Sequence, residues 1–261
     1  MILDEILAAK RAEVEAAKAR LSLAELQRRI RGHVAQRGFR QTLAGSPRMP
    51  ALIAELKRQS PSKGMLRERF DPVRLAQELQ EAGASALSIL TDERFFGGSL
   101  GILRDVQPFV DVPILRKDFI IDPYQIYEAL YAQADAVLLI VRALSPAQLR
   151  EFIMVSLEIG IDTLVEVHEE AELEVAIKAG ATLIGINHRN LDDFTMDHTL
   201  TDRLIPRMPP RIVRVAESGV HDRQELQRLK ALGVDAVLIG EALMTAPEPG
   251  EKVRELFQGI W

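Results

Sequence analysis

Eight short apolar runs recur along the chain, and longer stretches of mixed polar and apolar positions separate them. The runs are apolar at nearly every position, which is typical of strands covered on both faces, as in a parallel sheet. They predict strands at residues 51–57, 85–90, 112–117, 135–141, 162–167, 182–187, 211–217 and 235–240.

The stretches between the runs carry helix signals. DPVRLAQELQEAG, SPAQLREFIMVSLEIG and HDRQELQRLKALG end on glycine, and the first two open with Asp-Pro or Ser-Pro. One junction, a helix end followed by a buried strand, repeats in EAGASALSIL, KAGATLIGIN and ALGVDAVLIG. Eight strand–helix units in 261 residues predict an α/β fold, a single (β/α)8 barrel. An open doubly wound sheet is the rival, but KRQSPSKG after the first strand lacks the glycine spacing of a dinucleotide turn.

We expect one domain, with residues 1–47 as an N-terminal helical extension and 48–261 as the barrel. The opening MILDEILAAKRAEVEAAKAR carries charges throughout, so it predicts an amphipathic helix and not a signal peptide. No apolar run approaches the roughly 20 residues that span a bilayer. We therefore expect a cytoplasmic, monofunctional protein with no membrane partner.

Composition narrows the possible chemistry. The net charge is -5 and no long basic run occurs, which argues against nucleic acid as a partner. The absence of cysteine excludes disulfides, thiol nucleophiles and Cys-ligated zinc. The histidines show no metal-ligand spacing, and the HEE at 168–170 is interpreted as a helix N-terminus. We predict no metal site.

Charged residues follow the apolar part of several predicted strands. Side chains two apart in a strand share a face, so Glu55 and Lys57 both lie on the inner side of the first strand. The same phasing puts Lys117, Glu166 and Glu217 on the inner sides of three other strands. A single such charge is usually a solvated rim residue. Because five unpaired charges would be costly in a packed barrel, they predict one shared site where barrel enzymes place catalysis.

The last two strands suggest a phosphate site. AESGV and LIGEALM put small residues where a loop or short helix begins, and barrels often bind phosphate there on backbone N–H groups. Two ordinary tight turns are the alternative. His188 lies between Asn187 and Arg189, and strand alternation predicts that it points away from a ligand.

Seven segments together resemble one enzyme family, indole-3-glycerol phosphate synthase. They are IAELKRQSPSKG, LTDERFFGGS, LRKDFIID, LVEVH, GINHRNL, VAESGV and LIGEALM, in order from residue 53 to 244. His188 departs from the family pattern, which usually reads Asn in INNRNL. The resemblance implies a carbon–carbon lyase of tryptophan biosynthesis that uses no cofactor. It would act on 1-(2-carboxyphenylamino)-1-deoxyribulose 5-phosphate, closing the pyrrole ring with loss of CO2 and water.

The resemblance also implies catalytic roles. Lys117 would be the general acid that protonates the carbonyl oxygen, and Glu166 the base in dehydration. Glu55 would be a proton partner that pairs with Lys117. Lys57 would hold substrate anions and donate a proton in the later step.

The resemblance implies a set of substrate-binding residues as well. Aromatic and leucine side chains suit the aryl ring, Asn187 and Arg189 orient the sugar and the reacting carboxylate, and small residues mark the phosphate. Glu241 could act there only through its backbone, because its charge would repel phosphate. The full set is Ser60, Phe96, Phe119, Leu138, Asn187, Arg189, Leu191, Glu217, Ser218, Gly219, Gly240 and Glu241.

Other readings stay open at this stage. A Schiff-base aldolase could use Lys57 or Lys117 on a sugar phosphate. A sugar-phosphate isomerase could use the same barrel but has no need for the apolar patch around Phe96 and Phe119. A non-catalytic phosphate-binding protein gives no reason for the charges to converge. The expected partner is a phosphorylated small molecule, and we expect a monomer.

Overall fold

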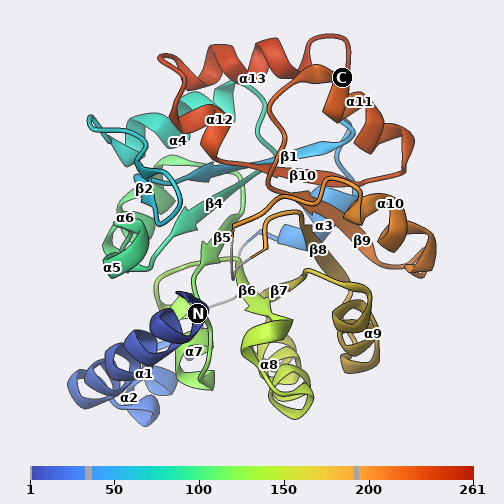
Figure 1. The fold of residues 1–261 in the computed structure, drawn as a ribbon. Helices are drawn as coiled ribbons and strands as arrows, with labels where there is room; N and C mark the ends of the chain where they lie inside the picture. The colour runs from blue at the N-terminus through green and yellow to red at the C-terminus, as the bar shows by residue number, and fades with distance from the viewer. Residues whose placement is uncertain (1, 33–36, 191–193) are drawn as a thin grey trace.

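The computed structural model describes residues 2–32, 37–190 and 194–261. Eight parallel strands close into a barrel in the order β1-β10-β9-β8-β7-β6-β5-β4 (Figure 1). The predicted (β/α)8 barrel is confirmed, and each barrel strand lies inside its predicted range. The strands are β1 Ala51–Leu56, β4 Ala86–Leu90, β5 Ile114–Lys117, β6 Ala136–Ile140, β7 Asp162–Val167, β8 Leu183–Asn187, β9 Val213–Glu217 and β10 Ala236–Ile239.

Helices surround the barrel and alternate with its strands (Figure 1). Ser145 and Gln148 form a capping box at the start of α8, and Gly160 ends that helix with φ +78°, as its Ser-Pro and Gly signals predicted. The helices between strands are α4 Pro72–Glu81, α5 Glu93–Phe96, α6 Leu100–Val106, α7 Pro123–Tyr131, α8 Pro146–Ile159, α9 Glu170–Ala179, α10 Leu200–Leu204 and α11 Arg223–Ala231. After β10 come α12 Glu241–Met244 and α13 Pro249–Phe257, and 3-10 turns occupy Gln107–Phe109 (η1), Val141–Ala143 (η2) and Ile205–Arg207 (η3).

A short hairpin follows β1, formed by β2 Gln59–Ser60 and β3 Gly64–Met65. The prediction had only a loop here. Strands of two residues carry no alternation that a sequence pattern could reveal. The hairpin folds the segment after Lys57 back on itself at the carboxyl end of β1.

Both faces of the barrel strands are buried, which explains their continuous apolar character. Ile53, Leu115, Leu164 and Val215 belong to the cluster inside the barrel, as the strand phasing predicted. The opposite faces pack in a second cluster beneath the surrounding helices. Only the carboxyl ends of the strands are therefore free to carry charged side chains toward a cavity.

Three helices precede the first strand: α1 Ile2–Arg20, α2 Leu23–Arg29 and α3 Phe39–Ala44. The predicted helical extension is therefore present. α1 lies beside α7 (Figure 1), where the Tyr124 hydroxyl donates to the Ala17 carbonyl at 3.2 Å and Lys18 pairs with Asp122 at 2.7 Å. Phe39 of α3 is fully buried in the cluster inside the barrel.

Aspartates occupy the amino ends of the strands. Asp135 and Asp235 precede β6 and β10, and each accepts a hydrogen bond at 2.8 Å from the neighbouring strand, from the N–H of Ile114 and Arg214 respectively. The repeated Asp-Ala-Val sequence thus ties adjacent strands together, at the end opposite the predicted site. Across the described residues, no helix is both long and apolar enough to cross a membrane.

Candidate active site

A pocket opens at the carboxyl ends of the barrel strands. The space between its walls, including solvent at the open mouth, is about 780 Å³. The charged residues predicted to converge do line one cavity. The site residues predicted from sequence that line this pocket are Glu55, Lys57, Ser60, Phe96, Lys117, Phe119, Leu138, Glu166, Asn187, Arg189, Glu217, Ser218 and Glu241.

Lys117 ends β5 and projects its ammonium among carboxylates from other strands. Its Nζ lies 3.1 Å from Glu166 Oε2 and 3.6 Å from Glu217 Oε2. Burial lowers the pKa of Lys117, but the nearby carboxyl groups, that of Glu166 foremost, outweigh burial and raise the pKa above its usual range. Lys117 is therefore a cation at neutral pH.

Glu217 ends β9 and is 1% exposed. Neither of its side-chain oxygens accepts a hydrogen bond from the described residues. Burial and the charge of Glu166 raise the pKa of Glu217 to about 8. Glu217 is thus mostly a neutral carboxylic acid at pH 7. Gly185 of β8 makes room for it, since a Cβ there would lie 1.9 Å from Glu217 Oε1.

Glu55 and Lys57 pair with each other. Lys57 Nζ donates to Glu55 Oε1 at 2.6 Å, so the expectation that Glu55 pairs with Lys117 is wrong for this structure. Residues two apart in a strand share a face and lie about 6.6 Å apart, whereas β4 separates β1 from β5, which puts Lys117 about two strand spacings, roughly 10 Å, away. Gly240 stands directly against this pair, and a Cβ there would lie 2.4 Å from Glu55 Oε1.

Glu166 lies between two cations. On one side is Lys117, and on the other His168 Nε2 lies 3.2 Å from Glu166 Oε1. Burial raises the pKa of Glu166, but Lys117 and His168 outweigh it and hold the pKa well below its usual range. His168 also lies 3.3 Å from Glu172 Oε2. Burial lowers the pKa of His168, whereas Glu166 and Glu172 raise it to a net value of about 9.

The remaining polar residues lie toward the pocket rim. Arg189 Nη2 pairs with Glu241 Oε2 at 3.1 Å, and its backbone N–H donates to Asn187 Oδ1 at 3.0 Å. Lys63, in the loop between β2 and β3, lies 3.8 Å from the other Glu241 oxygen. Glu241 is therefore held by two cations.

Apolar side chains form the opposite wall. The rings of Phe96 and Phe119 have centroids 6.2 Å apart, and Leu138 of β6 lies on the same cavity. An edge of aromatic and aliphatic groups suits a flat ring. Leu191, predicted to join this wall, lies outside the described residues.

A smaller cavity adjoins the pocket beyond β9 and β10. Ser218, Gly219 and Gly240 line it, together with two ion pairs that line both cavities, Lys57–Glu55 and Arg189–Glu241. Ser218 has φ +67°, in the left-handed region that costs a non-glycine residue about 1–2 kcal/mol. Within the described part of the chain, the backbone N–H groups of Gly219 and Val220 make no hydrogen bond. Free N–H groups beside two cations can bind an anion.

Comparison with known proteins identifies the family. The family model described as indole-3-glycerol phosphate synthase matches residues 3–256. The chain belongs to the indole-3-glycerol phosphate synthase family. It is similar to the indole-3-glycerol phosphate synthases of Chlorobium luteolum, with 47% identity over 94% of each chain, and of Dehalococcoides mccartyi strain CBDB1, with 44% identity over 98% of this chain and all of that one.

Solved structures show the same barrel at low sequence identity. The 3-hexulose-6-phosphate synthase of Salmonella typhimurium superposes with a TM-score of 0.64 at 15% identity, over 80% of this chain and 98% of that one. The N-acetylmannosamine-6-phosphate 2-epimerase of Clostridium perfringens does so with a TM-score of 0.60 at 16% identity, over 81% and 93%. These likenesses support the fold alone, whereas membership of the synthase family rests on the closer relatives.

Two cations that the sequence did not predict, His168 and Lys10, pair with residues of this synthase-family pocket or beside it, although neither lines the pocket itself. His168 was interpreted as part of a helix start, although its position two residues after Glu166 puts both on one face. Lys10 of α1 is 3% exposed and pairs with Asp92 and Asp118 at 2.9 Å each. Asp118 is the residue that follows Lys117 in sequence. Its signal was its place on the buried face of α1. Further lining residues that were not predicted are Pro61, Ser62, Leu90, Asp118, Ile140, Phe194 and Leu238.

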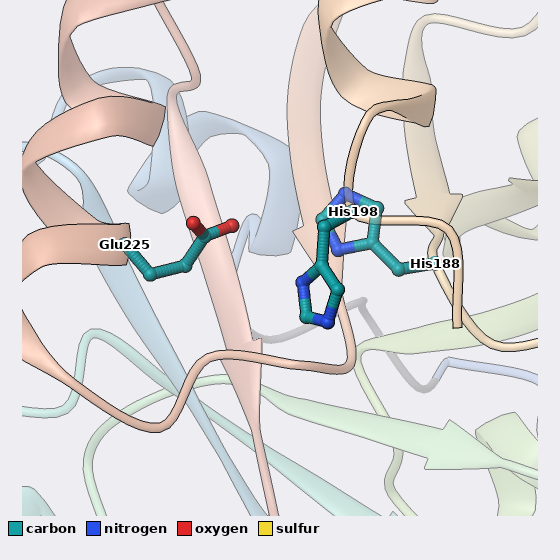
Figure 2. A group of neighbouring side chains, drawn as sticks. All are labelled: His188, His198 and Glu225. Atoms are coloured by element: carbon teal, nitrogen blue, oxygen red, sulfur yellow. The ribbon is translucent and has the colours of Figure 1, made fainter.

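The one candidate metal group found among the described residues is His188, His198 and Glu225, whose potential ligand atoms lie within 4.8 Å of one another (Figure 2). These groups have other partners. His188 Nδ1 bonds the Ser218 carbonyl and its Nε2 bonds the Thr201 hydroxyl, while Arg228 donates to both Glu225 oxygens at 2.9 and 2.7 Å. A metal would have to displace these bonds beside the Arg228 guanidinium, so the geometry favours a hydrogen-bonded cluster.

Glu217→Gln should change how stability depends on pH. A carboxyl ionises near pH 4.3 in an unfolded chain, whereas that of Glu217 ionises near 8 in the folded protein. The folded wild type therefore keeps a proton that the unfolded chain has lost, and its stability falls as pH rises between these values. The variant cannot ionise, so its advantage in Tm should grow from pH 5 to 8 and then level off. Thermal melts across that range measure it.

Glu158→Gln is the matched control, because Glu158 is exposed on α8. Its Tm difference from wild type should stay small and flat with pH. A Glu217→Gln difference that is equally flat would mean that Glu217 is ionised in the folded protein at neutral pH.

Proposed function

We propose that the chain catalyses the indole-3-glycerol phosphate synthase reaction of tryptophan biosynthesis. The substrate is 1-(2-carboxyphenylamino)-1-deoxyribulose 5-phosphate. The observation that carries the proposal is the Lys117 ammonium, held between Glu166 and Glu217 at the carboxyl end of the barrel. Because partners from two other strands hold this ammonium in position, it can serve as a general acid for a substrate bound beside it.

Ring closure needs an acid at the ribulose carbonyl. The aryl carbon that bears the carboxylate attacks the carbonyl carbon, a carbon–carbon bond forms, and Lys117 gives its proton to the carbonyl oxygen. Loss of CO2 then returns the bonding electrons to the ring and restores aromaticity. The charges of Glu166 and Glu55, which keep Lys117 protonated at neutral pH, support this role.

Dehydration needs a base and an acid. Glu166 is assigned as the base that removes a proton from the methylene carbon beside nitrogen, while the hydroxyl leaves as water with a proton from Lys57. The two cations beside Glu166 support the assignment, because they keep it ionised. Glu55, bonded to Lys57 at 2.6 Å, is placed to return a proton to it. Glu217, as a neutral acid, is assigned as a hydrogen-bond donor to substrate.

The substrate carries two anionic groups and one aromatic ring. The phosphate is assigned to the smaller cavity, on the backbone at Ser218, Gly219 and Gly240, and the free N–H groups there support this. Lys57 and Arg189 line both cavities and supply positive charge. The aryl ring is assigned to the apolar wall.

Asn187 and Arg189 are proposed to orient the sugar and the reacting carboxylate. Ser60 is proposed to contact the phosphate end from the hairpin after β1. The side chain of Glu241 is assigned to holding Arg189 and Lys63, so that only its backbone faces phosphate. Leu191 keeps its expected place at the aryl ring as a prediction.

A Schiff-base aldolase is less well supported. Imine formation needs a neutral lysine, usually one whose pKa is lowered by a hydrophobic pocket or a second cation. The surroundings of Lys117 raise its pKa instead. The monomeric state and the cytoplasmic location inferred from sequence stay predictions.

The direct test is turnover of the proposed substrate. The purified chain is incubated with 1-(2-carboxyphenylamino)-1-deoxyribulose 5-phosphate while indole fluorescence and released CO2 are followed. One CO2 should appear for each indole formed. No indole from a folded protein would overturn the proposal, and trapping of substrate by borohydride would favour an aldolase.

Lys117→Met should abolish most turnover. The change keeps a long side chain but removes the proton donor, so kcat should fall on the order of a hundredfold or more. Circular dichroism should show an intact fold. Lys178→Met is the control, since the Lys178 side chain is 79% exposed on α9. Near-normal kcat in Lys117→Met would remove Lys117 from the mechanism.

Gly219→Ala should weaken binding of the phosphorylated product more than of its dephosphorylated analogue. Gly219 has φ +79°, and a Cβ there would lie 2.7 Å from His198 Cε1 and 2.8 Å from Met196 Cε. Because alanine is strained at this φ and its Cβ would overlap two neighbouring side chains, we expect the turn and its N–H groups to shift. Titrations of indole-3-glycerol phosphate and its dephosphorylated form, followed by fluorescence, give the ratio of variant to wild-type Kd for each ligand.

Gly233→Ala separates backbone strain from the phosphate effect. Gly233 has a similar φ of +82°, but the nearest atom to its added Cβ is 3.5 Å away. This control should lose stability without selective loss of phosphate binding. Equal weakening of both ligands by Gly219→Ala would contradict a phosphate site at this turn.

A further inference from the structure

His188 directly follows Asn187, the last residue of β8, but its side chain faces the other way. It is 1% exposed and does not line the pocket, whereas Asn187 does, as strand alternation predicted. Its backbone is held on both sides, because its N–H donates to the Glu217 carbonyl at 3.0 Å and its carbonyl accepts from the Asp197 N–H at 2.8 Å. These two hydrogen bonds fix the position of the His188 backbone beside the end of β9, from which the imidazole projects.

The hydrogen bonds of His188 define one tautomer. Nδ1 lies 3.0 Å from the carbonyl oxygen of Ser218, which can only accept, so Nδ1 carries the proton. Nε2 of the neutral ring then accepts from the hydroxyl of Thr201, a fully buried residue of α10. Burial lowers the pKa of His188, which favours the neutral ring. Thr201 thus aims the Nδ1–H at Ser218.

The Ser218 carbonyl lies in the turn to which the proposed function assigns phosphate binding. It belongs to the same peptide group as the Gly219 N–H. Ser218 and Gly219 both have positive φ, of +67° and +79°. A serine leaves that region readily unless its surroundings hold it there. His198 backs the same turn, with its ring centroid 5.8 Å from that of His188 and its Cε1 close to the space a Gly219 Cβ would fill (Figure 2).

We propose that His188 is a positioning residue for phosphate: its Nδ1–H holds the Ser218 carbonyl and so keeps the free N–H groups of Gly219 and Val220 directed at the anion. The proposal rests on the phosphate site of the proposed function. It also accounts for a histidine where the family pattern usually has asparagine. The side-chain nitrogen of asparagine stands at the same distance along the side chain as Nδ1, so both residues can donate to this carbonyl.

His188→Leu and His188→Asn form the test pair. Leucine fills similar space but cannot donate, while asparagine keeps the donor to Ser218 and loses the reach to Thr201. We expect His188→Leu to raise KM about tenfold, because the variant loses one hydrogen bond that positions the anion site. The kcat value should change far less. His188→Asn should stay within about threefold of wild-type KM.

Two further measurements keep the result interpretable. Inorganic phosphate is titrated into each protein, which needs no turnover, and its Kd should follow the same order of wild type, Asn, Leu. Thr201→Val removes the hydroxyl behind the ring and should raise KM less than His188→Leu does. Thermal melts confirm that each variant is folded at the assay temperature.

The outcomes separate the two proposals. Wild-type protein that binds phosphate but does not make indole would contradict the proposed function and leave the variant comparison valid. Equal effects of Leu and Asn, or a loss in kcat with KM unchanged, would overturn the role of His188. Wild-type protein that makes indole but binds no phosphate would overturn the role of His188 and leave the proposed function standing.

Discussion

A half-buried lysine needs compensating charge, and this requirement organises the pocket around Lys117, whose side chain is 15% exposed. An ammonium removed from water is costly unless anions surround it. Glu166 and Glu217 approach it from β7 and β9, and Glu55 adds charge from β1. The like-charged carboxylates in turn repel one another, so one of them, Glu217, keeps its proton. One cation thus separates an ionised base from a neutral acid.

The barrel supplies the frame for this arrangement. Alternate strands of the barrel contribute side chains to one layer of its interior, so side chains near the ends of β1, β5, β7 and β9 meet without long loops. Glycines then make the space that the carboxyl groups need. Gly185 leaves room for Glu217, and Gly240 leaves room for Glu55. Any side chain at either position would push an acid out of its place.

Much of the fold and of the pocket follows from sequence, because strand alternation is a strict rule. It put Glu55, Lys57, Lys117, Glu166 and Glu217 on inner faces, and the structure has all of them on one cavity. It also turned His188 away from that cavity. Strand alternation does not predict which charged side chains pair across the barrel, since pairing depends on strand register and side-chain length. The partner of Glu55 was therefore wrong.

Other features depend on segments far apart in the chain. Lys10 meets Asp92 and Asp118 only because α1 packs over the β5–α7 connection, which no local pattern reveals. Glu172, one turn into the following helix, joins Glu166 in raising the pKa of His168. The contact between His188 and the Ser218 turn joins two strand ends 30 residues apart. Tertiary packing, and not propensity, decides such contacts.

The charge on Lys117 is the central claim, and nitrogen NMR of the lysine side chains measures it directly. Protein labelled with 15N-lysine is titrated from pH 6 to 10, and the Lys117 signal is assigned by its absence in Lys117→Met. Because nearby carboxylates raise its pKa, its Nζ shift should stay that of an ammonium throughout. A midpoint below about pH 9, under the ordinary lysine value near 10.4, would contradict the account.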